Sequence, residues 1–241
     1  MSASLHSTYV KNRNLAYWSG HRKRFIDAIG PDVVKDIDDF VAGPGVDTAF
    51  DDLWTVTRVE GGAGESTVTR TDAVGGALLI TTDAAENDGV NMQGIGEAFE
   101  LTGDQVLYFG ALGLKISDAT QSDFFIGLAI TDTDILGGVT DRIGFEKLDG
   151  ATAIKFMLEK DSTETLTASL ATAVADTAYD LEFFWDGATI EVFVNGVSVA
   201  TPAVTNLPND EFLRKSIHFL AGEAVAKTFT LDKLAIIMIG R

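Results

Sequence analysis

The strongest constraint on the fold is a run of alternating residues between Tyr179 and Val199. Two dipeptides interrupt this run, Asp186-Gly187 and Asn195-Gly196. Such pairs form the two-residue turns of β-hairpins because both turn positions need a positive φ. Between the turns the apolar residues Ile190, Val192 and Val194 occupy every second position, as in a strand with one buried face. The segment therefore predicts a meander of three antiparallel strands.

The same two-residue period continues through most of the chain after Gly45. Clusters rich in glycine, asparagine and aspartate separate the apolar runs, and no helical pattern intervenes. Many short strands at this spacing predict an antiparallel β-sandwich. The predicted strands are Trp54–Val59, Ser66–Arg70, Ala77–Thr82, Gly89–Gln93, Gln105–Ile116, Asp123–Thr131, Arg142–Glu146, Ile154–Leu158, Glu164–Leu170, Thr177–Trp185, Thr189–Val194, Val197–Ala200, Ser216–Ala221 and Lys227–Ile239.

The residues before Gly45 predict helices instead. Pro31 suits a first helical turn, and Gly43-Pro44-Gly45 ends the segment. The apolar residues between them fall on one helical stripe, which predicts a helix over residues 31–42. A second helix is predicted over residues 15–29. We therefore divide the chain into a basic arm with an amphipathic helix, residues 1–44, and a β-sandwich domain, residues 45–241.

Charge is distributed unevenly between these two parts. The first 26 residues hold five basic and no acidic side chains, whereas the whole chain has 36 acidic residues and a net charge of −18. Three interpretations of the arm stay open: docking on a partner protein, a self-folded helix, or nucleic-acid binding. Docking is favoured, because the acidic body opposes nucleic acid and aromatic and arginine side chains suit interfaces. The predicted contact residues are Lys11, Arg13, Tyr17, Trp18, Arg22, Lys23 and Arg24.

Several segments resemble a known fold family. The hairpin Leu181–Gly196, the strands around Phe125–Ala129 and Ile143–Phe145, and the closing strand Phe229–Ile239 resemble concanavalin A-like (laminin-G-like) domains. The resemblance implies an all-β, antiparallel jelly-roll sandwich, here with an N-terminal arm and one or two short helices. In organisation, a compact body behind a basic arm with no cysteine and no signal peptide is similar to capsid decoration (cement) proteins of tailed bacteriophages.

That second resemblance implies a non-enzymatic virion structural protein on the capsid exterior. Its expected partners are the major capsid protein or another virion protein, and sister copies in a homo-oligomer, with neither nucleic acid nor a membrane as partner. The alternative is a carbohydrate-binding, lectin-like module, free or mounted on a virion. Such a module would stack sugar rings on exposed aromatic side chains, with Trp54, Trp185 and Tyr108 as candidates.

No catalytic, cofactor or metal site is predicted. Glycoside hydrolysis needs two carboxyl groups flanking the scissile bond, and glucanases of this fold place them in a Glu-x-Asp-x-x-Glu strand that this sequence lacks. Glu182, Asp186 and Glu191 are interpreted as solvated charges, so a glycanase requires two carboxylates that converge in a cleft. The acidic loop from Asp132 to Asp141 is either solvated, the favoured interpretation, or a calcium site. His218 is expected on a strand face, and no histidine pair has zinc spacing.

Overall fold

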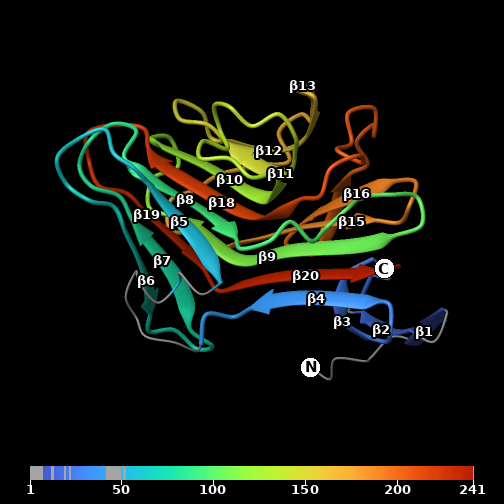
Figure 1. The fold of residues 1–241 in the computed structure, drawn as a ribbon. Helices are drawn as coiled ribbons and strands as arrows, with labels where there is room; N and C mark the ends of the chain where they lie inside the picture. The colour runs from blue at the N-terminus through green and yellow to red at the C-terminus, as the bar shows by residue number, and fades with distance from the viewer. Residues whose placement is uncertain are drawn as a thin grey trace.

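The structure, a computed structural model, describes residues 8–11, 14–18, 20–21, 23–41, 50 and 53–240. Within these ranges every regular element is a β-strand and there is no helix. Two large sheets pack against each other, and a small sheet formed by the N-terminal strands lies against the outside of one of them (Figure 1). In the described part of the chain, no helix has the length and apolar character needed to cross a bilayer.

The first large sheet has eight strands. Its order is β13-β12-β11-β10-β18-β8-β5, with β14 paired to β12, and every pairing is antiparallel. Its strands are β5 (Trp54–Val59), β8 (Gly89–Gly94), β10 (Ser122–Ala129), β11 (Arg142–Lys147), β12 (Ala153–Lys160), β13 (Thr163–Leu166), β14 (Ala171–Thr172) and β18 (Arg214–Ala221).

The second large sheet has nine strands. Its order is β17-β16-β15-β9-β19-β7-β6, and β20 pairs with both β9 and β4. Its strands are β4 (Val33–Asp38), β6 (Thr67–Thr71), β7 (Ala77–Thr81), β9 (Val106–Ile116), β15 (Tyr179–Trp185), β16 (Ile190–Val194), β17 (Val197–Ala200), β19 (Thr228–Leu231) and β20 (Lys233–Ile239).

The core lies between these two sheets. Alternate residues of β10, Phe124, Ile126 and Leu128, belong to one apolar cluster with inward residues of the nine-stranded sheet. Phe109 stacks on Phe183 of the neighbouring strand with ring centroids 5.0 Å apart, and across the core Phe156 contacts Phe183 with centroids 5.3 Å apart. Burial of these side chains is the main stabilising contribution, and alternation sends their neighbours to the outer face of each sheet.

The predicted all-β antiparallel sandwich is confirmed, and most predicted strands after Gly45 overlap observed ones. The predicted strand Lys227–Ile239 is instead two strands, β19 and β20, the strand predicted over Glu164–Leu170 ends at Leu166, and β14 was not predicted. The meander is β15–β16–β17. Asn195 and Gly196 adopt positive φ angles of 50° and 77°, as a type I′ turn requires. Strong turn chemistry and a two-residue period were therefore sufficient to locate these elements.

Both predicted helices are wrong. Residues 31–42 contain strand β4, which pairs with β20 from Val33 opposite Ile239 to Asp38 opposite Leu234. The β-branched residues Val33, Val34 and Ile37 suit this extended edge, and pairing satisfies the backbone groups along one side. Residues 15–29 contain most of β2 (Asn14–Trp18) and all of β3 (Phe25–Ile29), which pair with each other, and β2 pairs also with β1 (Thr8–Lys11).

The described N-terminal strands also do not form a separate arm. Trp18 and Phe25 are buried in one apolar cluster with Tyr108, Phe184 and Ile237 on the outer face of the nine-stranded sheet. The boundary between residues 44 and 45 stays a prediction, although β4 is hydrogen-bonded into the sandwich through β20.

Candidate functional site

The outer face of the eight-stranded sheet carries an unusual set of buried polar side chains. Where β8, β10, β11 and β18 send apolar residues inward, their alternate residues point to the opposite face. Buried polar residues are costly unless they have partners, and they are therefore informative. On this face the buried polar residues are Asn91, Gln93, Asp123, Arg142, Glu146, Glu159, Ser216 and His218.

Strand register places four of the outward residues in one row. Asn91 lies opposite His218, His218 opposite Phe125, and Phe125 opposite Glu146, on four neighbouring strands. We call these four residues the polar row. In the adjacent register position Gly127 faces Gly144. A Cβ atom on either glycine would collide with the backbone of the other strand, so the sheet surface stays free of side chains there.

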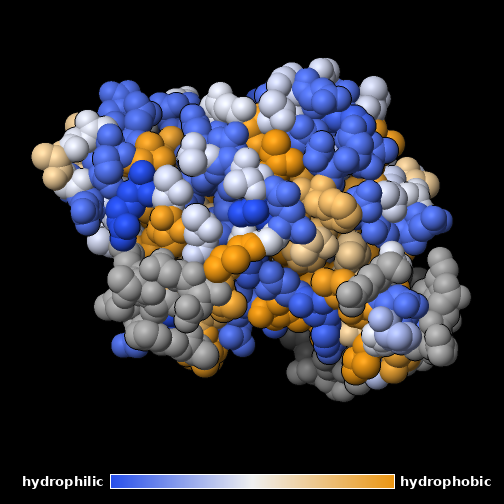
Figure 2. All heavy atoms as spheres, in the orientation of Figure 1, coloured by the Kyte–Doolittle hydropathy of each residue, from blue (hydrophilic) through white to orange (hydrophobic). Residues whose placement is uncertain are grey.

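Residues 130–141, which connect β10 to β11, lie over this face, and we call them the cover segment. Ile135 and Val139 are buried in a small cluster with Phe125, Ala129 and Met157 of the sheet. In Figure 1 this connection is among the yellow-green loops above β10 and β11. The surface over this side of the molecule is mostly hydrophilic (Figure 2).

Side chains of the sheet hold the backbone of the cover segment. Asn91 Nδ2 donates to the carbonyl of Asp132 at 2.8 Å, and Gln93 Nε2 donates to that of Ile130 at 2.8 Å. Gln93 Oε1 accepts from the Asp132 amide at 2.9 Å, and Arg142 Nη1 donates to the carbonyl of Ile135 at 2.6 Å. The sheet thus contacts mainly main-chain groups of the cover segment.

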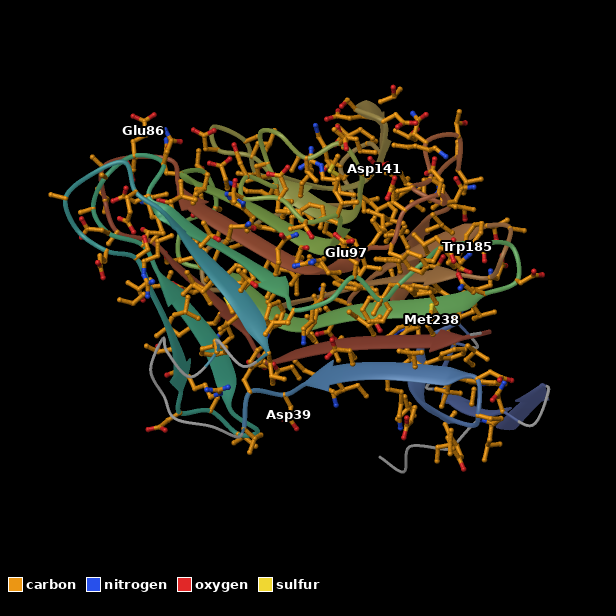
Figure 3. The ribbon with its side chains drawn as sticks, viewed as in Figure 1. Asp39, Glu86, Glu97, Asp141, Trp185 and Met238 are labelled. Carbon is orange, nitrogen blue, oxygen red and sulfur yellow. The ribbon has the colours of Figure 1, made fainter. Side chains whose placement is uncertain are left out.

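The two ends of the cover segment are also fixed. The Thr131 amide and hydroxyl both donate to Glu97, and these bonds hold the pKa of Glu97 below its usual value. At the other end the Asp161 amide donates to Asp141 at 3.3 Å, and the Ser162 amide donates to the Thr140 carbonyl at 2.9 Å. Figure 3 labels Glu97 and Asp141, the latter among the side chains above the eight-stranded sheet.

Three polar atoms of the row have no hydrogen-bond partner among the described residues. They are both ring nitrogens of His218, whose side chain is 0 % exposed, and Oδ1 of Asn91. Burial lowers the pKa of His218 to about 4, so the imidazole is neutral at pH 7. A neutral imidazole has one donor and one acceptor nitrogen, and both are available here to a group that reaches this face.

The charged groups at the same face are partly neutralised. Arg142 Nε lies 2.7 Å from a carboxylate oxygen of Glu159 and pairs with Glu164 at 3.6 Å. Burial raises the pKa of Glu146, with Arg142 acting against this change. The protonated form of Glu146 is thus favoured relative to that of an exposed carboxyl group, which is the direction of change that a general acid needs.

The predicted contact residues of the arm lie elsewhere in the molecule. Lys11 belongs to β1, and Arg13 and Arg22 lie outside the described residues. Tyr17 is partly buried on β2, where it pairs with Asp27, and Trp18 is buried. Lys23 Nζ lies 3.2 Å from Glu191 and 3.4 Å from Asp186, and Arg24 Nη2 lies 2.7 Å from Glu182. The structure thus brings Trp18, Lys23 and Arg24 against the chain's own sandwich, and their contact with another protein stays a prediction.

The acidic residues near the hairpin differ from their interpretation as solvated charges. Glu182 is only 1 % exposed and is held by Arg24 and by the Tyr108 hydroxyl, which donates to it at 2.7 Å. Glu191 and Asp186 pair with Lys23. These carboxylates attach the N-terminal sheet to the sandwich.

Among the remaining candidates from the sequence, the aromatic residues do not offer the exposed rings that sugar stacking needs. Trp54, Trp185 and Tyr108 are buried, so none of them offers a flat exposed ring. In the acidic loop, Asp132 Oδ1 accepts from the Asp134 amide, and Asp134 Oδ1 accepts from the Gly137 amide. Within the described ranges, no three His, Asp or Glu side chains are grouped in a way that could hold a metal ion. His218 does lie on a strand face, as expected.

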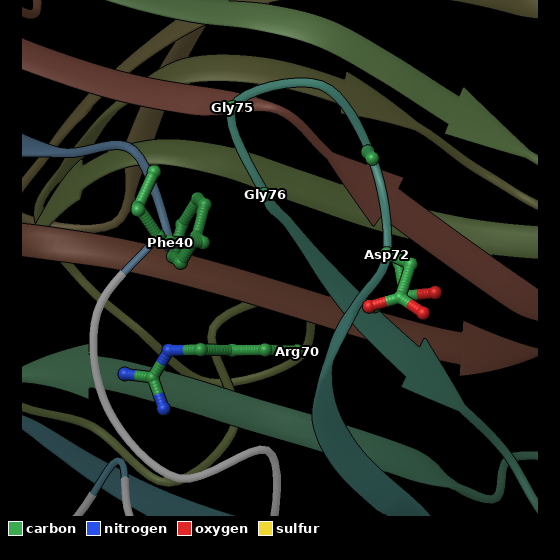
Figure 4. A pocket seen from close by; sticks show the side chains of 8 residues that line it. Phe40, Arg70, Asp72, Gly75 and Gly76 are labelled. Carbon is green, nitrogen blue, oxygen red and sulfur yellow. The ribbon is translucent and has the colours of Figure 1, made fainter.

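Two surface hollows lie away from the polar row. One, of about 450 Å³, is lined by Phe40, Arg70, Asp72 and the Gly75-Gly76 turn (Figure 4). The other, of about 700 Å³, runs along β4 beside Ile95 and Lys215. Neither contains a buried polar row like that on the outer face of the eight-stranded sheet.

Comparison with solved structures identifies the fold as a concanavalin A-like jelly-roll sandwich, the fold of several glucanases. An endo-1,3-β-glucanase from Streptomyces sioyaensis is similar with a TM-score of 0.62 and 13% identity, over 90% of this chain and 100% of that one. A family 16 glycoside hydrolase from Bacteroides ovatus, solved with a mixed-linkage glucan product, gives 0.59 and 12%, over 83% and 99%. A pseudo β-1,3-glucanase and immunostimulatory antigen of Mycobacterium tuberculosis gives 0.59 and 11%, over 87% and 99%.

No protein-family model matches the chain, and no curated protein matches it in sequence. The predicted jelly-roll fold is confirmed by the solved structures. The similar solved structures are glucanases, and they contradict two other predictions. These are that the protein is a virion structural protein and that it is not an enzyme. Both came from features that do not determine the fold, namely the charge of the N-terminal residues and the absence of one linear motif.

Sequence reasoning also missed the polar row as a unit. Its members come from four strands, of which β8 and β18 are distant in the chain from β10 and β11, and only the register brings them together. The available signal was the alternation of polar with apolar residues in Asn91-Met92-Gln93 and Ser216-Ile217-His218, on strands that lie inside the sheet.

Proposed function

We propose that the protein binds glycans of the β-glucan class on the outer face of its eight-stranded sheet. The observation that carries this proposal is the polar row, in which amide, imidazole and carboxyl groups flank the ring of Phe125. Sugar hydroxyls pair with such donors and acceptors, and the apolar face of a sugar ring packs on an aromatic ring. This agrees with the lectin-like alternative, although the residues differ from those expected for it.

The named substrates and products of the structural neighbours support the choice of glycan. They are described as 1,3-β-glucanases and mixed-linkage glucanases, and one is called a pseudo β-1,3-glucanase. The neutral donors and acceptors of Asn91, Gln93, Ser216 and His218 fit an uncharged polysaccharide better than an anionic one.

Hydrolysis of the bound glycan is a second candidate function, and one observation favours it. Glu146 is buried in the polar row, and its raised pKa suits a general acid. The second carboxyl group would come from Glu159 or Glu164 on the two next strands.

One titration tests both functions. A β-1,3-glucan hexasaccharide and a mixed-linkage tetrasaccharide are titrated calorimetrically, and released reducing ends are measured in the same samples. Glu146→Gln keeps the shape of the side chain but removes its charge and acidity. We expect this variant to bind about tenfold more weakly, a loss typical of one charge-assisted hydrogen bond, and to lose any turnover.

Glu86 is exposed on the loop before β8 and is not part of the polar row (Figure 3), so Glu86→Gln is the matched control and should behave like the unmodified protein. Equal affinities of the Glu146 variant and the control would place the glycan elsewhere. No binding of either oligosaccharide by the unmodified protein would reject the proposed function.

A further inference from the structure

The cover segment is attached to the sandwich as a small unit of its own. Its two buried anchors, Ile135 and Val139, belong to a cluster separate from the main core. The residues around these anchors, from Thr131 to Thr140, are mostly exposed. Moving this segment would therefore leave the contacts between the two large sheets intact.

The cover segment is also internally compact. Asp134 accepts hydrogen bonds from the amides of Gly137 and Gly138, and Asp132 accepts one from the amide of Asp134. These bonds are local to the segment and do not depend on the sheet. The segment can thus move as a unit once its bonds to Asn91, Gln93 and Arg142 are released, with its ends at Thr131 and Asp141 as the points of bending.

The cover segment packs on the apolar part of the face and is bonded to Asn91, Gln93 and Arg142, but it leaves part of the polar row without partners. Ile135 and Val139 pack around Phe125, Ala129 and Met157, beside the bare surface of the Gly127–Gly144 pair. His218 and Asn91 Oδ1, in contrast, receive no hydrogen bond from it. Buried polar atoms without partners destabilise the covered arrangement relative to one in which a ligand satisfies them.

We propose that the cover segment is displaced when glycan binds, and that a sugar ring then takes the place of Ile135 and Val139 on Phe125. This inference rests on the proposed function and adds how the site is controlled. Hydroxyl groups of the ring occupy the free nitrogens of His218 and Oδ1 of Asn91. Arg142 keeps its ion pair with Glu159 when it releases the carbonyl of Ile135. The apparent affinity is then lowered by the small fraction of molecules in which the segment is open.

The test weakens the anchor of the cover segment and leaves every residue of the polar row in place, although Ile135 packs on Phe125. In Ile135→Ala the open fraction increases, so the β-1,3-glucan hexasaccharide should bind about tenfold more tightly than to the unmodified protein. Amide hydrogen exchange at residues 131–139 should be faster in the variant without ligand. In the unmodified protein, exchange there should become faster when the hexasaccharide is added, while exchange in β10 and β11 slows.

Ile190→Ala is the matched control, because it removes the same atoms from the main core, on a strand of the other sheet. It should lower overall stability and leave the affinity and the exchange of residues 131–139 unchanged. If the unmodified protein binds the hexasaccharide but Ile135→Ala binds it equally or more weakly, the cover proposal is overturned and the proposed function is not. No binding by any of the three proteins overturns the proposed function, and the cover proposal with it.

Discussion

His218 is the residue at which stability and binding oppose each other most clearly. It is fully buried, and neither ring nitrogen has a partner in the described part of the chain. An unsatisfied buried polar group costs about 1–3 kcal/mol. Because His218 destabilises an otherwise well-packed sheet, we attribute its presence there to ligand binding and not to folding.

His218→Leu should therefore remove a pH dependence of stability. The folded pKa of about 4 lies below the ordinary value of 6.5, so between these values the unfolded chain binds a proton that the folded chain does not. Stability is lost as the pH falls through this window, by roughly 3 kcal/mol at pH 4. Urea unfolding at pH 7, 5.5 and 4 should show this loss in the unmodified protein and a smaller loss in the variant. Parallel curves for the two proteins would contradict the assignment.

At the scale of elements, one ion pair attaches the N-terminal sheet to the sandwich. Arg24 contacts both oxygens of Glu182, at 2.8 and 3.0 Å from its Nε.

Arg24→Ala leaves the buried Glu182 charge uncompensated and should lower the free energy of unfolding by about 3 kcal/mol. Adding Glu182→Gln, which still accepts from Tyr108, should recover most of this loss. Lys23→Ala is the control, since its pairs are more exposed and are worth at most about 1 kcal/mol. Equal losses in Arg24→Ala and Lys23→Ala, measured by urea unfolding, would contradict this account.

The sequence predicted elements where local chemistry decides the structure, and failed where distant pairing decides it. The turns at Asp186-Gly187 and Asn195-Gly196 defined β15 to β17. In residues 33–41 the apolar positions fit a helix as well as a strand, and the deciding partner, β20, lies about two hundred positions later in the chain. The polar row could not be predicted for the same reason, because its four members share a face only through register.

At the scale of the whole molecule, both outer faces of the sandwich are covered by other parts of the chain. The N-terminal sheet packs on the nine-stranded sheet through Trp18 and Phe25, and the cover segment packs on the eight-stranded sheet through Ile135 and Val139. The first attachment adds a buried ion pair, whereas the second leaves polar atoms without partners. On the eight-stranded sheet a ligand can therefore form hydrogen bonds that the cover segment does not form.

The net charge of −18 determines which glycans can approach that face. A strongly negative surface repels anions over about a Debye length, which is about 8 Å at 0.15 M salt and 30 Å at 0.01 M. We expect a neutral β-1,3-glucan hexasaccharide to bind with an affinity that changes little between 0.01 and 0.15 M NaCl. A hexasaccharide of uronic acids should bind at least tenfold more weakly at the lower salt concentration, and the difference should narrow as salt is added. Tighter binding of the oligouronate, or binding that weakens with salt, would show that local cations such as Arg142 outweigh the charge of the whole protein.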